Sequence, residues 1–100
     1  MIKTEYDKNV ITVFLSGEID HNNAGSIRSQ IDGQAESLHP KTLTLDFSKV
    51  SFMDSSGIGL IMGRYRTMSL LGGNLRVVNV PKRLEKIIAL SGVGALGVLK

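Results

Sequence analysis

A hydroxyl-rich junction occupies residues 54–57, where Asp54-Ser55-Ser56-Gly57 leads directly into an apolar run that predicts a helix. Aspartate and serine are preferred at helix N-termini, where a side-chain oxygen accepts a hydrogen bond from a free backbone N–H. A serine hydroxyl can also attack a substrate or receive a phosphoryl group. The residues alone therefore leave three roles open: a helix cap, a nucleophile and a modification site.

A catalytic serine is the weakest of these roles. The hydrolase elbow reads G-x-S-x-G on a sharp strand-to-helix turn, and the sequence M-D-S-S-G around Ser55 does not match it. A nucleophilic serine also needs a base, and the chain has two histidines, His21 and His39. His39 is expected on the far side of the sheet, and His21 lacks an oxyanion-hole motif. We therefore expect no catalytic residues and no enzyme.

Nucleotide and metal sites are not indicated either. The sequence has no G-x-x-x-x-G-K-[ST] and no G-x-G-x-x-G. Glu18, Asp20 and His21 are close in sequence, but no second cluster has the spacing of metal ligands. We expect no cofactor and no metal. One alternative is a nucleotide or small anion at the Ser55 helix start, where free N–H groups favour negative charge.

Phosphorylation fits the junction on physical grounds. A phosphate adds about −1.5 to −2 charge at pH 7, and a helix N-terminus tolerates that charge. The helix need not unfold, so the modification would act on whatever surface docks there. Asp54 and Asp20 would add like charge, and a desolvated dianion would repel an apolar or acidic partner surface. This arrangement predicts a switch.

Strands alternate with helices around this junction. Apolar residues in alternation or in β-branched runs predict strands, and apolar residues three and four apart predict helices. Strands are expected at 2–6, 10–15, 42–47 and 75–80, with a short one at 96–99. Gly17 is expected to break the second strand. Helices are expected after 20–23, after Asp54 and from Pro81, ending at 39–40, 72–73 and Gly92.

The helix after the junction has one apolar face at helical spacing. The residues expected to be buried are Ile58, Ile61, Met62, Tyr65, Met68 and Leu71. Gly59, Leu60 and Gly63 fall on its other faces. They could form an exposed contact patch, or they could be a surface leucine with glycines that allow close helix packing.

The order ββαβαβα predicts an α/β fold. Residues 1–100 are expected to form one domain, a partly parallel sheet with an N-terminal hairpin. Functional sites in open α/β sheets lie beyond the carboxyl ends of the strands. Asp20 and Ser55 both fall there, on loops that lead from a strand into a helix.

Composition excludes several functional classes. The chain has no cysteine and a net charge of +3, with 12 Lys and Arg scattered among 9 Asp and Glu. Without a basic stripe or stacking aromatics, direct nucleic-acid binding is not expected. No apolar run approaches 18 residues and no signal peptide is visible, so neither a membrane span nor export is expected. The expected location is cytoplasmic.

Three segments carry a family resemblance: S-F-M-D-S-S-G-I-G-L-I-M-G-R-Y at 51–65, G-E-I-D-H-N-N-A at 17–24 and G-G-N-L-R-V-V at 72–78. Together they resemble the anti-sigma factor antagonists of the STAS-domain family, and within it the sporulation-type antagonist of the anti-sigma F factor. The resemblance covers residues 3–92. It implies a STAS-type mixed four-stranded sheet with an N-terminal hairpin and three to four helices.

The same resemblance implies a function. The unphosphorylated protein would bind an anti-sigma factor that is also a serine kinase, thereby releasing a sigma factor. The kinase would phosphorylate Ser55 and end the complex, and a PP2C-type phosphatase would restore it. The residues implied in partner binding are Asp20, His21, Asp54, Ser56, Ile58, Gly59 and Leu60.

The loop at residues 20–23 departs from the sporulation type. Asn22-Asn23 stands where that type often has further His and Thr. A stress-response-type antagonist with a different partner is therefore the alternative within the family.

Overall fold

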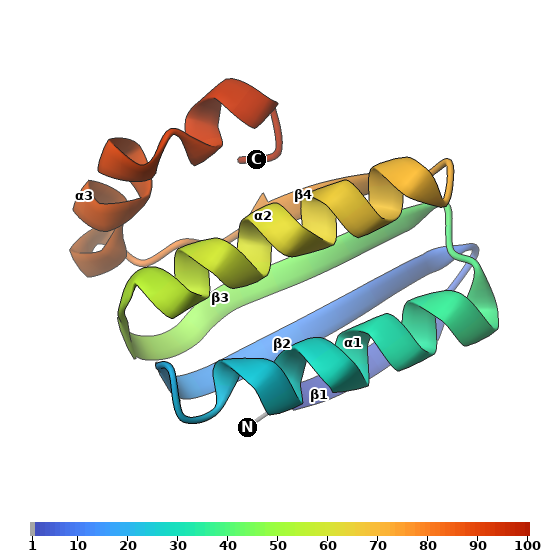
Figure 1. Cartoon of the computed structure of the whole chain (residues 1–100), viewed down its shortest axis with the longest axis horizontal. Coiled ribbons are helices and arrows are strands. Elements are labelled where there is room, and N and C mark those ends of the chain that lie inside the picture. Colours follow the sequence, from blue (N-terminus) through green and yellow to red (C-terminus); the bar gives the residue numbers. More distant parts are fainter. Residues whose placement is uncertain (1) are drawn as a thin grey trace.

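Within residues 2–100, four strands and three α-helices follow one another in the expected ββαβαβα order (Figure 1). This architecture is seen in a computed structural model, which describes residues 2–100. The strands are β1 (Ile2–Asp7), β2 (Val10–Ile19), β3 (Thr42–Met53) and β4 (Asn74–Val78). The helices are α1 (Ala24–Leu38), α2 (Ser55–Leu70) and α3 (Lys82–Ser91), followed by the 3-10 helix η1 (Val93–Leu96).

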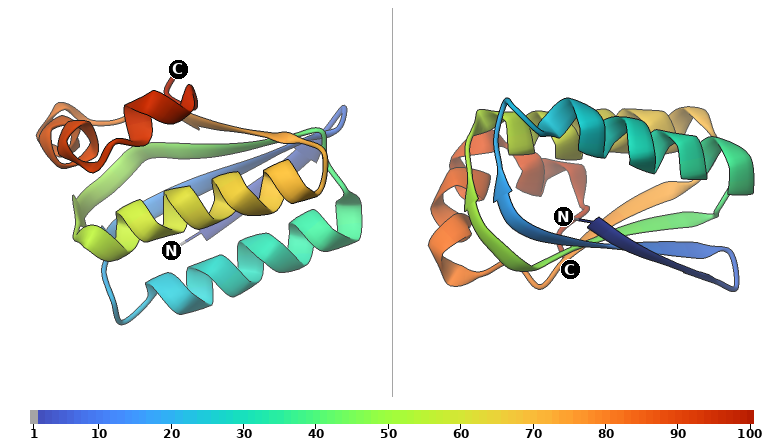
Figure 2. Two further views of the ribbon diagram at one scale, coloured as in Figure 1. Left: turned by 45° about the horizontal axis from the view of Figure 1, so that its top comes forward. Right: turned by 90° about the horizontal axis from the view of Figure 1, so that it is seen from below.

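The sheet is mixed, with the strand order β1-β2-β3-β4. β1 and β2 form an antiparallel hairpin, whereas β2 with β3 and β3 with β4 are parallel pairs. The hairpin turn places Lys8 and Asn9 at positive φ, as a two-residue turn that follows the strand twist requires. α1 and α2 lie side by side on one face of the sheet (Figure 2). The predicted mixed four-stranded sheet is therefore confirmed.

Two strands run further than the sequence predicts, which corrects the expected break at Gly17. β2 continues through Gly17 to Ile19, and β3 continues past residue 47 to Met53. The pairing register shifts between Phe14 and Ser16 and again after Gly17, which has φ 79°. Such irregularities disturb the alternation of side chains, so the sequence pattern ends before the strand does.

The C-terminal end of the sheet also differs in detail. β4 ends at Val78, because Asn79 has a φ of 56° that an extended strand cannot continue through. The short strand expected at 96–99 is reduced to one parallel bridge, between Val77 and Leu99. In its place, η1 is enclosed by the left-handed glycines Gly92 and Gly97.

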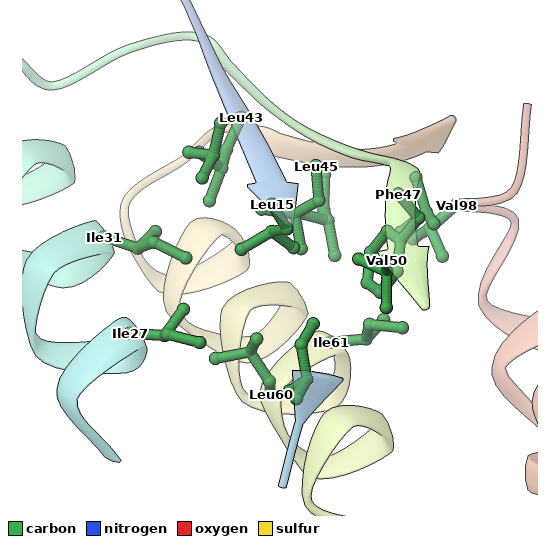
Figure 3. Packing of buried hydrophobic residues seen from close by; sticks show 14 of the residues in the cluster. Leu15, Ile27, Ile31, Leu43, Leu45, Phe47, Val50, Leu60, Ile61 and Val98 are labelled. Atoms are coloured by element: carbon green, nitrogen blue, oxygen red, sulfur yellow. The ribbon is translucent and has the colours of Figure 1, made fainter. Parts of the chain in front are cut away.

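The core lies between the sheet and the helices. It is aliphatic apart from Phe47 (Figure 3). β2 and β3 contribute Ile11, Val13, Leu15, Leu43, Leu45 and Phe47, and the helices contribute Ile27, Ile31, Leu60, Ile61 and Met68. Within residues 2–100, none of the helices is both long enough and apolar enough to cross a bilayer.

α2 buries a different face from the one predicted. Leu60 is only 3% exposed and lies on the side of α2 that faces α1, near Ile27 (Figure 3). The expected surface position of Leu60 is therefore wrong, while Leu71, expected to be buried, is 39% exposed. The reason is that α2 packs against α1 as well as against the sheet, which rotates its buried arc toward Leu60 and Arg64.

Arg64, on the buried side of α2, links α2 to α1. Its side chain is 5% exposed, and its Nε lies 2.8 Å from Oδ1 of Asp32 on α1. Nη2 donates to the other carboxylate oxygen of Asp32 at 3.3 Å, and Nη1 donates to the carbonyl of Leu60 at 3.4 Å. Burial lowers the pKa of Arg64, although the carboxylate of Asp32 opposes this effect. A buried cation that has lost its partner is costly, so the pair fixes α1 to α2.

We expect Leu60→Ala to lower the free energy of unfolding by about 2–5 kcal/mol, because it removes a core side chain and leaves a cavity. Leu70→Ala is the matched control, since Leu70 is in the same helix but 82% exposed. It should change the unfolding free energy by about 0.5 kcal/mol or less. Urea denaturation of both variants measures the difference. Equal effects would contradict the orientation of α2.

Candidate functional site

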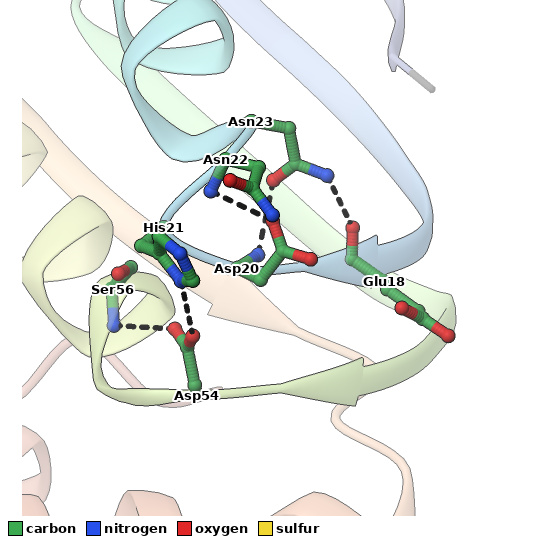
Figure 4. A network of polar contacts seen from close by, with 7 residues as sticks. All are labelled: Glu18, Asp20, His21, Asn22, Asn23, Asp54 and Ser56. Atoms are coloured by element: carbon green, nitrogen blue, oxygen red, sulfur yellow. Dashed lines mark hydrogen bonds and ion pairs between the residues drawn. The ribbon is translucent and has the colours of Figure 1, made fainter.

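The candidate site is formed by two loops at the same edge of the sheet. Ile19 and Met53 are partners at the ends of the parallel strands β2 and β3, so the loops that follow begin side by side. The backbone N–H of Asp54 donates to the carbonyl of Ile19 at 3.2 Å. Nδ1 of His21 lies 3.8 Å from Oδ2 of Asp54 (Figure 4). The expectation that Asp20 and Ser55 both lie on loops beyond the carboxyl ends of the strands is confirmed.

The loop between β2 and α1 is held mainly by its own hydrogen bonds (Figure 4). Oδ1 of Asp20 accepts from the backbone N–H of Asn22 at 2.9 Å. Oδ1 of Asn23 accepts from the backbone N–H of Asp20 at 3.0 Å, and its Nδ2 donates to the carbonyl of Glu18 at 2.8 Å. Asn23 is the N-cap of α1, but its side chain bonds the loop and not the helix. The side chains of Asp20 and Asn23 therefore set the shape of this loop, and His21 is left 79% exposed.

The second loop starts α2, and its cap is Asp54. The backbone of Asp54 is extended, and its Oδ1 accepts from the N–H of Ser56 at 2.8 Å. That N–H bond is the main cause of a lowered pKa at Asp54. Desolvation of the carboxyl acts in the opposite direction, but the Ser56 hydroxyl and His21 also lower the pKa, so the net shift is downward. Of the roles left open by the sequence, helix capping thus belongs to Asp54, which stays ionised at neutral pH.

Ser55 is left free by this arrangement. It is the first residue of α2 and is exposed. Within residues 2–100 its hydroxyl has no hydrogen-bond partner, because the capping bond is made by the preceding carboxylate. A free hydroxyl at a helix start can enter another protein's active site, and the N–H groups beside it favour an added negative charge.

Gly57 allows the first turn of α2 to lie against the end of β3. A Cβ atom at this position would overlap the side chain of Met53. Gly59, further along the helix, has no atom within 4 Å of such a Cβ. The glycine of the D-S-S-G segment is therefore a packing requirement, which the sequence pattern alone did not distinguish from the glycines after it.

The other residues implied in partner binding are placed unequally. Ser56 and Ile58 are partly exposed and Gly59 is exposed, so their positions suit a contact surface. Leu60 is buried in the core and cannot serve as one. Among residues 2–100, no three His, Asp or Glu side chains converge as metal ligands do.

Comparison with known proteins identifies relatives of the chain. A family model described as the STAS domain matches residues 1–97. The Anti-sigma F factor antagonist of Paenibacillus polymyxa is 34% identical over 92 residues, which cover 92% of this chain and 79% of that protein. The predicted resemblance to anti-sigma factor antagonists is confirmed.

Solved structures support the same fold. The anti-sigma factor antagonist SpoIIAA in its unphosphorylated form matches with a TM-score of 0.87 at 29% identity, covering 100% of this chain and 86% of that chain. SpoIIAA in its phosphorylated form, described as a Bacillus cell fate determinant, matches with a TM-score of 0.78 at 29% identity, with coverage of 100% and 89%. The expected STAS-type architecture is confirmed.

We expect Gly57→Ala to destabilise the protein by about 1–3 kcal/mol, because the new methyl group overlaps Met53 in a packed region. Gly59→Ala is the control in the same helix. It should stabilise the protein by up to about 1 kcal/mol, since its methyl group meets open space and alanine favours a helix. Thermal and urea unfolding distinguish the two variants. Similar shifts would rule out the close contact at Gly57.

We expect Asp54→Ala to lower stability at pH 7, and we expect the deficit to shrink as the pH falls below about 4. The carboxyl pKa is lower in the folded state than in the unfolded chain, so ionised Asp54 stabilises the protein above the unfolded pKa. This contribution is lost as the pH falls through the folded pKa. Asp54→Asn keeps a side-chain oxygen that can cap the helix. This variant should therefore lose only the part of the stabilisation that depends on pH. Urea unfolding at several pH values measures both, and a deficit independent of pH would refute this account.

Proposed function

The chain belongs to the STAS domain family, and on that premise we propose that it is an anti-sigma factor antagonist. In this proposal the unphosphorylated protein binds an anti-sigma factor that is also a serine kinase, and the sigma factor is thereby released. Phosphorylation of Ser55 ends the complex. The protein is then a binding module and a kinase substrate, and not itself an enzyme.

The observation that carries the proposal is the free hydroxyl of Ser55. Asp54 accepts the capping hydrogen bond from Ser56, so the Ser55 hydroxyl is exposed and makes no bond that the kinase would have to break. A relative of the same fold is described in both an unphosphorylated and a phosphorylated form. That pair of states supports a phosphorylated residue in this chain, and the D-S-S-G resemblance assigns it to Ser55.

In the modification step, Oγ of Ser55 attacks the γ-phosphorus of ATP. The new O–P bond forms as the bond to the β-phosphate oxygen breaks, ADP leaves, and the hydroxyl proton passes to a base on the kinase. A PP2C-type phosphatase would reverse the modification by hydrolysing the phosphoserine. Neither step requires a catalytic group from this chain.

The phosphate acts by charge and not by unfolding the helix. It adds about two negative charges beside Asp54 and Asp20, at a helix N-terminus that can hold them. A partner surface that had been in contact there would face an uncompensated dianion, which is costly to desolvate. We assign the contact surface to Asp20, His21 and Ser56 together with Ile58 and Gly59.

The alternatives within the family differ in their support. A nucleotide or small anion bound non-covalently at the Ser55 helix start is disfavoured, because the carboxylate of Asp54 already accepts the hydrogen bond of the Ser56 N–H. A partner of the sigma F type is favoured over a stress-response type by the name of the Paenibacillus relative. The same binding experiment, run with anti-sigma factors of both types, decides between them.

We expect incubation with the anti-sigma factor kinase and ATP to add one phosphate, mapped by mass spectrometry to Ser55. Ser55→Ala should receive none, and Ser29→Ala, an exposed serine on α1, should be modified like wild type. Size-exclusion chromatography should show co-elution with the kinase before phosphorylation and its loss afterwards. A phosphate on Ser56, or a complex that survives the modification, would contradict the proposal.

A further inference from the structure

A groove of about 460 Å³ lies between α1 and α2. We call it the α1–α2 groove; its lining includes Gly25 and Arg28 from α1 and Gly59, Gly63, Arg64 and Arg66 from α2. Ser56 also lines the groove, at the end where α2 begins. The groove therefore starts beside Ser55 and extends away from it along both helices.

Positive charge dominates the lining. Three arginines and no acidic residue are among the side chains that line the groove. Arg64 is neutralised by its ion pair with Asp32. Arg28 and Arg66 have neither an ion pair nor a hydrogen bond to any residue in the part of the chain that is described. Two unpaired guanidinium groups thus face a hollow that has no compensating negative charge of its own.

The glycines of the groove are not explained by packing within the protein. A Cβ atom built on Gly25, Gly59 or Gly63 would have no atom within 4 Å. Glycine is unfavourable in the interior of a helix compared with alanine, so Gly59 and Gly63 weaken α2 without an internal benefit. The suggestion from the sequence that Gly59 and Gly63 allow close helix packing is wrong. Their effect is to keep the groove open.

We propose that the α1–α2 groove binds an acidic segment of the anti-sigma factor while Ser55 is presented to its kinase site; this inference rests on the proposed function. The unpaired Arg28 and Arg66 supply the charge complementarity, since guanidinium groups pair well with carboxylates. The open glycine positions let the backbone of that segment approach the helices closely.

With an acidic segment in the α1–α2 groove, phosphorylation of Ser55 weakens binding in a second way. Ser55 adjoins Ser56, which lines one end of the groove. A dianion on Ser55 would repel the acidic segment directly, in addition to blocking the contact at the two loops. Modification of one serine would then weaken both parts of the interface.

The charge of the groove is tested with the double variant Arg28→Glu and Arg66→Glu. The control is Lys3→Glu and Arg76→Glu, which makes the same change in net charge at exposed positions outside the groove. Binding of the unphosphorylated protein to the anti-sigma factor is measured by isothermal titration calorimetry at low and high salt. We expect the groove variant to bind at least about tenfold more weakly at low salt, with a smaller difference at high salt. The control should stay within about threefold of wild type.

The open shape is tested with Gly63→Leu, which fills the groove. Gly33→Leu is its control, because Gly33 is an exposed position of α1 with open space at its Cβ and does not line the groove. Gly63→Leu should weaken binding at least about tenfold and Gly33→Leu should not, with circular dichroism verifying that both are folded. If wild type binds and both groove variants bind equally well, the groove is not part of the interface. If wild type binds no anti-sigma factor, the proposed function is wrong, and the proposal that the groove binds an acidic segment of that factor is wrong with it.

Discussion

The parallel pairing of β2 with β3 is the constraint on which the site depends. The ladder continues through two register shifts until Ile19 meets Met53, and the N–H of Asp54 extends it by one more bond to the carbonyl of Ile19. A shorter ladder would leave the two loops free to separate. Because the pairing continues to the last residue of each strand, residues far apart in sequence share one edge of the sheet, and α1 and α2 begin there together.

The start of α2 divides three tasks among neighbouring residues. Asp54 satisfies a free N–H of the helix, Gly57 lets the first turn approach Met53, and the hydroxyl of Ser55 has no hydrogen bond to any residue that the structure describes. A serine acting as its own cap would have its oxygen engaged by the backbone. The acidic residue before it therefore does more than add charge, because it releases the hydroxyl from a structural role.

Much of the fold and part of the site follow from sequence patterns. Alternating strands, helical spacing and the glycines and prolines at element ends predict the order of elements, and the strand-to-helix loops predict which residues lie at the carboxyl edge of the sheet. Leu60 and Arg64 could not be placed in this way, because the buried arc of α2 is set by α1 as well as by the sheet. An arginine within the buried arc, paired with Asp32, also hides the apolar pattern. The lengths of β2 and β3 were missed because register shifts interrupt the alternation that marks a strand.

The loop between β2 and α1 has a consequence for how such proteins diversify. Its hydrogen bonds run among Glu18, Asp20, Asn22 and Asn23, and a 3.8 Å contact joins His21 to Asp54 on the loop that begins α2. Apart from His21, residues on this loop can therefore change without disturbing Ser55 or its cap, Asp54. A duplicated gene could acquire a new partner through mutations in the first loop while keeping the same chemistry in the second. Several copies could then coexist in one cell, each recognising a different partner through the same edge of the sheet.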